Sequence, residues 1–309
     1  MSESLARPRS LLQDQERLAS PQSETKRIVS AFLLSKTATF GALVFALFLL
    51  TAILAPVLAP HDPNLQDLKR RLAPPVGLGM EKASWEYPLG NDNLGRDILS
   101  RLLAGSRVSC VVGVTTILFS AIVGSLIGAV SGFYRGFVDN IVMRIVDVWL
   151  SFPGLLLAIS FGAALGAGLV NLILALSLTS WVVYCRVVRA EVLSVRERDY
   201  VMAARVVGAS DLRIILRHVL PNILAPILVI STLRMGTVII AEASLNFLGV
   251  GVQSAVPTWG GMLSDGREFM RKAWWLATFP GIAISIVVLS VNLMGDGLRD
   301  ALDPRLRRR

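Results

Sequence analysis

Long stretches without any charged residue constrain this 309-residue chain more than any other feature. A helix rises about 1.5 Å per residue, so about 20 apolar residues cross the roughly 30 Å hydrocarbon core of a membrane. The composition agrees, with 53% hydrophobic and 17% charged residues, against about 45–50% and about 25% in soluble domains. We therefore predict an all-α, polytopic membrane protein. The uncharged stretches are residues 38–60, 108–134, 148–185 and 273–295.

The number of spans depends on residues 148–185, which are too many for one crossing. The segment "GAALGAGLVN" (162–171) is rich in glycine and ends in asparagine, a composition that interrupts helices. We expect two spans here, with Pro153 kinking the first of them. A further apolar segment at 220–247 adds one more. The sequence therefore predicts six transmembrane helices.

The distribution of Lys and Arg sets the orientation, because these residues accumulate in cytoplasmic loops near the ends of spans. Five spans would place the seven arginines of 186–217 outside the cell. Six spans place them inside, so we expect cytoplasmic N and C termini. The segments then inside carry six, two, seven and five Lys or Arg, in the order 1–36, 135–147, 186–217 and 296–309. The outside segments, 61–107 and 248–272, carry seven and three.

These segments divide the chain into five parts. The first is polar and is expected to be a disordered cytoplasmic tail. The membrane core contains five spans and a cytoplasmic loop at 190–221. The parts are the N-terminal tail (1–36), the first transmembrane helix (37–60), an extracytoplasmic stretch (61–107), the core (108–295) and a cytoplasmic tail (296–309).

Two local patterns add to this outline. In the extracytoplasmic stretch, Asp92 and Asn93 are N-cap candidates for a short amphipathic helix with Leu94, Ile98, Leu99 and Leu102. That helix either lies along the membrane surface or docks a partner protein. In the second span, glycines recur every four residues and favour close packing within the chain over a dimer seam. They are Gly124, Gly128 and Gly132.

A polar cassette, "DYVMAARVVGASDLRIILRHVLPN" (199–222), interrupts the apolar core. Gly208 stands where a helix ends in the left-handed conformation. Ser210 is a good N-cap, and Asp211 suits the first turn of a second helix. Pro221 marks the exit toward the next span. We therefore predict a helix-turn-helix, whose two apolar faces follow helical spacing: Tyr200, Ala203, Ala204 and Val207, then Leu212, Ile215, Leu216 and Val219.

The sequence of the cassette is compatible with three interpretations. It is a solvated loop whose arginines obey the charge rule, a DNA-binding motif, or a docking element for a cytoplasmic protein. A helix tied to membrane spans at both ends cannot readily enter a major groove, so we expect no nucleic-acid partner. We favour the docking element, because the small residues in the middle of its first face let a partner approach closely.

The cassette resembles the cytoplasmic loop of ABC importer permeases, whose pattern is E-A-A, three residues, Gly, nine residues, I-x-L-P. Ala203, Ala204, Gly208, Leu220 and Pro221 fall in register. The chain departs from the pattern at two positions, with Met202 at the usual Glu position and His218 at the usual Ile position.

Further motifs are similar to the C-type permeases of dipeptide and oligopeptide importers, and the likeness covers roughly residues 30–305. It implies a type I ABC importer permease fold in the bacterial cytoplasmic (inner) membrane. The implied partners are a homologous second permease, two ABC ATPases and an extracytoplasmic solute-binding protein. The motifs are "LAPHDPN" (58–64), "YPLGNDNLGRDILSRLLAGSRVS" (87–109), "AEASLNFLGVGVQ" (241–253), "PTWGGML" (257–263) and "GDGLRDALDPR" (295–305).

The resemblance leaves the solute open, because such permeases carry dipeptides, oligopeptides, glutathione or nickel complexes. A partner-gated channel or an export subunit is the alternative. The sequence has no G-x-x-x-x-G-K-[ST] pattern, so we expect ATP to be bound by partner subunits. We expect no cofactor to bind to this chain. With two histidines, His61 and His218, and no H-E-x-x-H or G-x-S-x-G, we expect no catalytic or metal site.

Two charged residues inside the fifth span are candidates for the substrate path, because a charge in the membrane must face protein or water. Arg234 lies near the middle of the span and Glu242 nearer its outer end. Arg234 either meets an anionic group of the substrate or pairs with Asp147, Glu242 or the partner permease. For Glu242 a structural or gating role is the other possibility.

Overall fold

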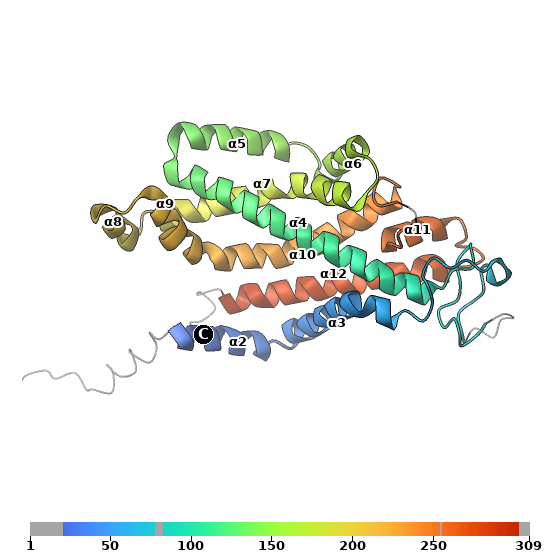
Figure 1. Cartoon of the computed structure of the whole chain (residues 1–309). Helices are drawn as coiled ribbons and strands as arrows, with labels where there is room; N and C mark the ends of the chain where they lie inside the picture. Colours follow the sequence, from blue (N-terminus) through green and yellow to red (C-terminus); the bar gives the residue numbers. More distant parts are fainter. Residues whose placement is uncertain (1–20, 78–82, 254, 303–309) are drawn as a thin grey trace, which may run out of the picture.

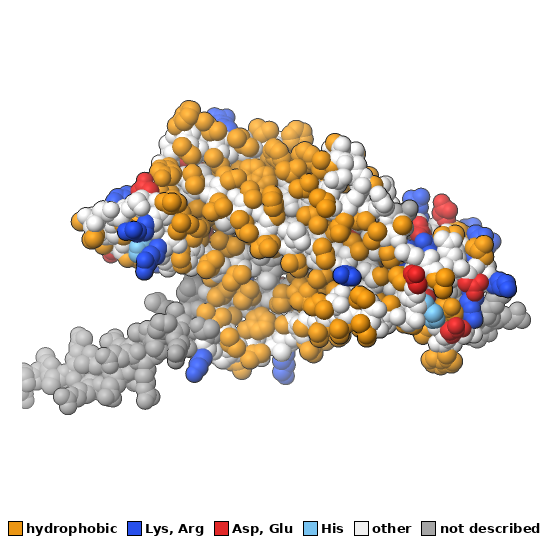
Figure 2. Space-filling view, in the orientation of Figure 1, with side chains coloured by type: hydrophobic (Ala, Val, Ile, Leu, Met, Phe, Trp, Pro, Cys, Tyr) orange, Lys and Arg blue, Asp and Glu red, His pale blue; other side chains and the backbone are white. Residues whose placement is uncertain are grey.

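The computed structural model describes residues 21–77, 83–253 and 255–302, and within these ranges the protein is helical without any β-strand. The long helices run side by side along the length of the molecule (Figure 1). Hydrophobic side chains cover the middle of the face in Figure 2, and most charged side chains gather toward its two ends. This distribution suits a bilayer around the middle of the bundle and confirms the all-α membrane class.

Five of the described helices are long and apolar enough to cross a membrane. The α10 span is continuous with the end of the cassette, so that residues 211–247 form one apolar run of helical turns. These helices are α3 (Lys36–Leu58), α4 (Ile98–Tyr134), α7 (Leu169–Val195), α10 (Leu224–Phe247) and α12 (Trp275–Leu302).

The sixth predicted span is a bent pair of helices, α5 (Gly136–Leu150) and α6 (Gly154–Leu165), which meet at 89°. Pro153 holds the break, with φ −58° and ψ 121°, where we expected only a kink within one span. Proline has no N–H to donate and disfavours helix in the preceding residue, so two elements form. The protein has six spans when this pair crosses as one, and the predicted glycine-rich break follows it, between Leu165 and Leu169.

Close packing of α4 on α7 forms the centre of the bundle. A Cβ atom built on Gly124 would lie 2.4 Å from the carbonyl oxygen of Trp181, and one on Gly128 would lie 2.4 Å from that of Cys185. Only glycine permits so close an approach of two helix backbones. The glycine stripe thus packs within the chain, as the sequence predicts.

The two ends of the chain differ from expectation. We expected disorder throughout 1–36, but Pro21–Leu34 form helix α2, which packs against α12, while residues 1–20 lie outside the described ranges. Proline suits the first turn of a helix, and a Cβ built on Gly297 of α12 would lie 3.6 Å from the Phe32 ring. At the other end α12 continues through the expected tail to Leu302, and residues 303–309 are not described.

The expected short amphipathic helix of the extracytoplasmic stretch does not exist as a separate element. Helix α4 begins at Ile98 and runs unbroken through the second span. Asp97 caps it, accepting hydrogen bonds from the backbone N–H groups of Leu99 and Ser100 at 3.3 and 3.1 Å. Asp92 lies in the preceding turn, where Gly95 has a positive φ of 77° that ends any helix started earlier.

Candidate functional site

The cassette forms one end of the molecule, beyond the C-terminal ends of α4 and α7 (Figure 1). It consists of α8 (Asp199–Val206), a turn, and the single helical turn α9 (Asp211–Ile214). A π-helical turn at Ile215–Val219 and a 3-10 turn at Leu220–Ile223 then lead into α10. Leu220 and Pro221 therefore lie in the junction between the cassette and the membrane span.

The turn between α8 and α9 has the backbone geometry that its sequence favours. Gly208 has φ +84°, and the N–H of Ala209 donates to the carbonyl of Ala204 at 3.1 Å, which closes α8 with a left-handed residue. Ser210 occupies the N-cap position of α9 with φ −65° and ψ 149°, but its hydroxyl makes no capping hydrogen bond. Asp211 follows in the first turn.

One side of the cassette packs on the bundle through a buried apolar cluster. The predicted faces are divided between the two sides: Ile215 and Val219 are buried, whereas Tyr200, Val207, Leu212 and Leu216 are exposed. The cassette carries two apolar stripes, and helical spacing alone does not tell which one meets the bundle. The buried cluster includes Val201, Ile214, Ile215, Val219 and Ile223 from the cassette and its junction with α10, and Phe133, Val188, Val192 and Val195 from α4 and α7.

The other side of the cassette presents apolar side chains to the outside. Val206 is 88% exposed, Val207 87% and Leu212 66%. An exposed apolar patch on a polar element is typical of a protein interaction site. We call the exposed residues of this side the cassette surface: Tyr200, Met202, Ala203, Val206, Val207 and Leu212.

Charged contacts fasten the base of the cassette to the end of α4. The Arg196 guanidinium donates to the carbonyl oxygen of Phe133, and Arg135 forms an ion pair with Glu197 at 2.9 Å. The Arg205 guanidinium lies 5.5 Å from the centre of the Phe133 ring, within the range of a cation–π contact. These contacts join the cassette to the end of α4.

Arg234 lines an open cavity of about 270 Å³ between α6, α7 and α10, in the apolar middle part of the bundle. The cavity wall also carries four hydroxyl groups, those of Thr179, Ser180, Thr237 and Ser244. Glu242 lies elsewhere, because it is eight residues further along α10 and points about 80° away around the helix. It is fully buried and accepts hydrogen bonds from Ser109 at 2.9 Å and Asn246 at 2.6 Å.

The carboxylates proposed from sequence as partners of Arg234 within this chain are engaged elsewhere. Asp147 pairs with Arg186, and Glu242 is bonded as described above. No carboxylate of the described residues lies within 4.0 Å of the Arg234 guanidinium, and its Nε atom is buried without a hydrogen-bond partner there. Pairing with Asp147 or Glu242 was therefore a wrong expectation.

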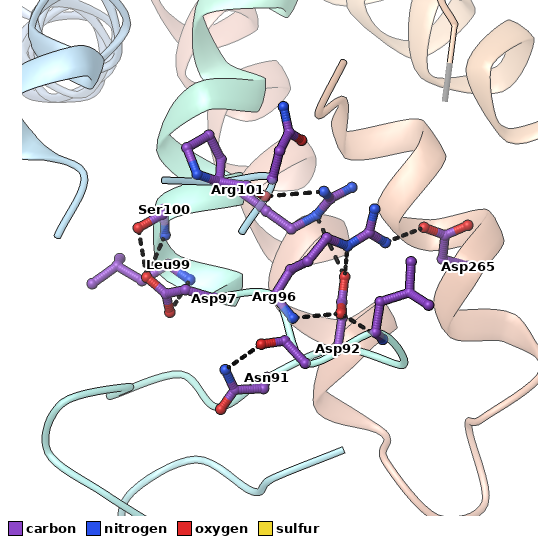
Figure 3. Close-up of polar contacts among 12 residues, drawn as sticks. Asn91, Asp92, Arg96, Asp97, Leu99, Ser100, Arg101 and Asp265 are labelled. Carbon is purple, nitrogen blue, oxygen red and sulfur yellow. Dashed lines mark hydrogen bonds and ion pairs between the residues drawn. The ribbon is translucent and has the colours of Figure 1, made fainter. Parts of the chain in front are cut away.

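A network of buried charges at the opposite end of the molecule was missed by the sequence analysis (Figure 3). Arg96 Nε donates to Asp92 at 2.6 Å, and Arg96 Nη2 donates to Asp265 of α11 (Trp259–Arg267) at 3.2 Å. Arg101 donates to the carbonyl of Pro63 at 3.2 Å and lies 3.6 Å from Asp92. The available signal was an acidic residue followed four positions later by a basic one, which occurs twice in "DNLGRDILSR".

The fold and sequence place this chain in a known class of transport proteins. Residues 124–308 match the family described as binding-protein-dependent transport system inner membrane component, and residues 23–75 match the N-terminal TM domain of oligopeptide transport permease C. The chain belongs to this family of ABC importer permeases, as its motifs predict. It is accordingly a multi-pass inner membrane protein and a transport subunit.

Individual relatives with similar sequences include permeases named for the transport of short peptides. The chain is 42% identical to the di/tripeptide transport system permease protein DppC of Pseudomonas aeruginosa, over 92% of this chain and 93% of the relative. It is 41% identical to the glutathione transport system permease protein GsiD of Pectobacterium atrosepticum, over 89% of each chain. The inward-facing MetNI methionine ABC transporter shares the fold, with a TM-score of 0.54 and 18% identity over 66% of this chain and 97% of that one.

Proposed function

We propose that this chain is the permease subunit of an ATP-driven importer of short peptides, in which the cassette surface docks a cytoplasmic ATPase. The cassette carries the proposal, because it combines an exposed apolar surface with a firm attachment to α4 and α7. The relatives named for di- and tripeptide transport favour a peptide as solute. The relative named for glutathione transport supports that tripeptide as the alternative solute.

The chemistry of the cassette surface suits a protein cleft. Val206 and Val207 are adjacent and almost fully exposed, beside the turn at Gly208. Burial of apolar surface contributes about 25 cal/mol per Å², so two valines and a leucine supply a few kcal/mol to docking. Ala203 adds a place where a partner can approach the helix backbone.

The connection to α10 supplies the mechanical step. Residues 211–247 are joined without a loop, so a push on the turn at Gly208 reaches the membrane span through helical turns alone. The Arg196–Phe133 contact carries the same push to α4. Closure of two ATPases would thus tilt the spans and exchange inward- and outward-open states.

The remaining parts of the proposed complex follow from this role. The cassette then faces the cytoplasm, as do both termini, because the N-terminal helix α2 and the end of α12 lie at the cassette end of the bundle (Figure 1). The chain lacks a phosphate-binding loop, so the ATPases bind the nucleotide. A second permease completes the path, and a solute-binding protein delivers the peptide to the opposite end.

Two measurements test the proposal in cells that lack this gene and carry a tagged copy of the chain. The first is uptake of labelled dialanine, and the second is capture of the ATPase by the tagged chain. We expect Val206→Asp combined with Val207→Asp to abolish both capture and uptake, while the chain still accumulates in the membrane. Leu65→Asp is the matched control for capture, because Leu65 is a 61% exposed apolar residue at the opposite end. Normal capture and uptake by the double variant would contradict the docking role.

A further inference from the structure

The proposed docking role does not explain the surroundings of Arg234. It lies about halfway along α10, within the apolar part of the bundle, and lines the cavity between α6, α7 and α10. A charge at this depth is costly in lipid, and such residues face protein or a water-filled path. The cavity gives the guanidinium that place.

The guanidinium has hydrogen-bond donors to spare. An arginine side chain carries five N–H donors and no acceptor. Within the described chain, Nε of Arg234 is buried without an acceptor, and no carboxylate lies within 4.0 Å. By contrast, Arg189 one helix away is satisfied by Asp139, with two hydrogen bonds of 2.5 Å. An anionic acceptor is therefore missing at Arg234 and supplied at Arg189.

The hydroxyl groups of the cavity wall complement the guanidinium. Thr179 donates to the carbonyl of Leu176 at 2.9 Å, and Ser244 donates to that of Ile240 at 2.7 Å. Thr237 donates to the carbonyl of Arg234 itself at 2.7 Å. Because their protons are used within their own helices, these oxygens remain as acceptors. The cavity therefore offers donors at Arg234 and acceptors along the rest of its wall.

This polarity matches an extended peptide in direction and in length. Arg234 and Ser244 are ten residues apart on α10, which is about 15 Å along the helix axis. An extended chain covers about 3.3–3.6 Å per residue, so a dipeptide or tripeptide, about 7–11 Å long, fits within that distance. A peptide has an anionic carboxylate at one end and an ammonium donor at the other, and both would find partners here.

We propose that Arg234 binds the C-terminal carboxylate of the transported peptide, making the permease itself selective for peptides with a free C-terminus. The inference rests on the proposed peptide import and deepens it. Charge-assisted hydrogen bonds to carboxylate are the strongest that a guanidinium forms, and two can form side by side. The alternative partner of Arg234 is a carboxylate side chain of the second permease subunit. The test distinguishes this carboxylate from that of the peptide.

The test compares uptake of dialanine with uptake of dialanine amide, which lacks the carboxylate, for the wild type and for Arg234→Gln in the assembled complex. Selection by the solute-binding protein is the same for both permeases, so it cancels when the acid-to-amide ratios are compared. We expect Arg234→Gln to lower that ratio at least tenfold, equivalent to about 1.4 kcal/mol. Arg234→Lys, which keeps the charge, is expected to restore most of it.

The matched control is Arg186→Gln, which removes an arginine that pairs with Asp147 outside the cavity and is expected to leave the ratio unchanged. An equal loss of both substrates in Arg234→Gln overturns the inference and assigns the carboxylate to the second permease. Unchanged uptake of both also overturns it. If the wild type takes up neither compound, the proposed peptide import fails and this inference fails with it.

Discussion

The Arg96 guanidinium donates to the carboxylate of Asp92 at 2.6 Å, and both side chains are less than 10% exposed. The same carboxylate lies 3.6 Å from Arg101, which is 3% exposed. Asp92 thus lies between two buried cations at the end of the bundle opposite the cassette, and Asp265 supplies a second negative charge to Arg96. Removing one partner of a buried ion pair costs far more than removing an exposed one, because the remaining charge stays buried.

We therefore expect Asp92→Ala to destabilise the protein by about 3–5 kcal/mol. The measurement is the thermal unfolding of the purified protein in detergent. Asp265→Ala is the matched control, because Asp265 also contacts Arg96 but is 46% exposed, and it should cost at most about 1 kcal/mol. Equal effects of the two changes would show that Asp92 does not neutralise the buried pair.

The contact of α4 with α7 leads to a second prediction. Gly128→Ala places a methyl group 2.4 Å from the carbonyl oxygen of Cys185, and the two helices must separate. We expect a loss of about 1–3 kcal/mol, which is typical of overpacking, seen as a lower midpoint of thermal unfolding. Gly154→Ala is the control, since a Cβ there meets no atom within 4 Å.

A third prediction concerns Arg196, which joins the cassette to Phe133. Arg196→Ala removes a charged hydrogen bond worth about 1.5–3 kcal/mol but leaves the cassette surface intact. The tagged variant should still capture the ATPase, while uptake of dialanine falls several-fold because the push reaches α4 less directly. Arg144→Ala, an exposed change on α5, should alter neither measurement. Full uptake by Arg196→Ala would argue that the contact carries no motion.

Two substitutions of Glu242 test whether this residue has a structural role or lies on the substrate path. Glu242→Gln keeps the size and an oxygen acceptor for the buried hydrogen bonds with Ser109 and Asn246, so we expect uptake within about twofold of the wild type and a small change in stability. Glu242→Ala leaves both partners unsatisfied, at a cost of about 1–3 kcal/mol for each buried group. Uptake lost in the glutamine variant, with stability preserved, would instead place Glu242 in the transport step.

Much of the fold is predictable from apolar run length, since lipid demands helices of a minimum length. The break before Leu169 and the turn at Gly208 are also predictable, because glycine marks both. The bend at Pro153 is not, since a proline within an apolar run is equally compatible with a kinked helix. Likewise the length of α4 depends on Asp97 rather than Asp92 forming the cap, because Asp92 instead accepts hydrogen bonds from the N–H groups of Leu94 and Arg96 in a tight turn.

The site is less predictable than the fold for a similar reason. Helical spacing identified two apolar stripes in the cassette, but the packing of Val201 and Ile214 on α4 and α7 decides which stripe remains exposed. The charge of Arg234 is visible in the sequence, whereas the engagement of Asp147 by Arg186 is not. Both features depend on neighbours that are far away in sequence.

Helix α4 has 37 residues in one unbroken element. Its length is about 55 Å, well beyond the roughly 30 Å of the hydrocarbon core. Arg101 sits near its first turn among the buried charges, and Phe133 sits near its last turn beneath the cassette. A rotation of about 5° about its midpoint moves each end by roughly 2 Å in opposite directions. A rigid helix of this length would therefore turn a small displacement at one end into an opposite displacement at the other.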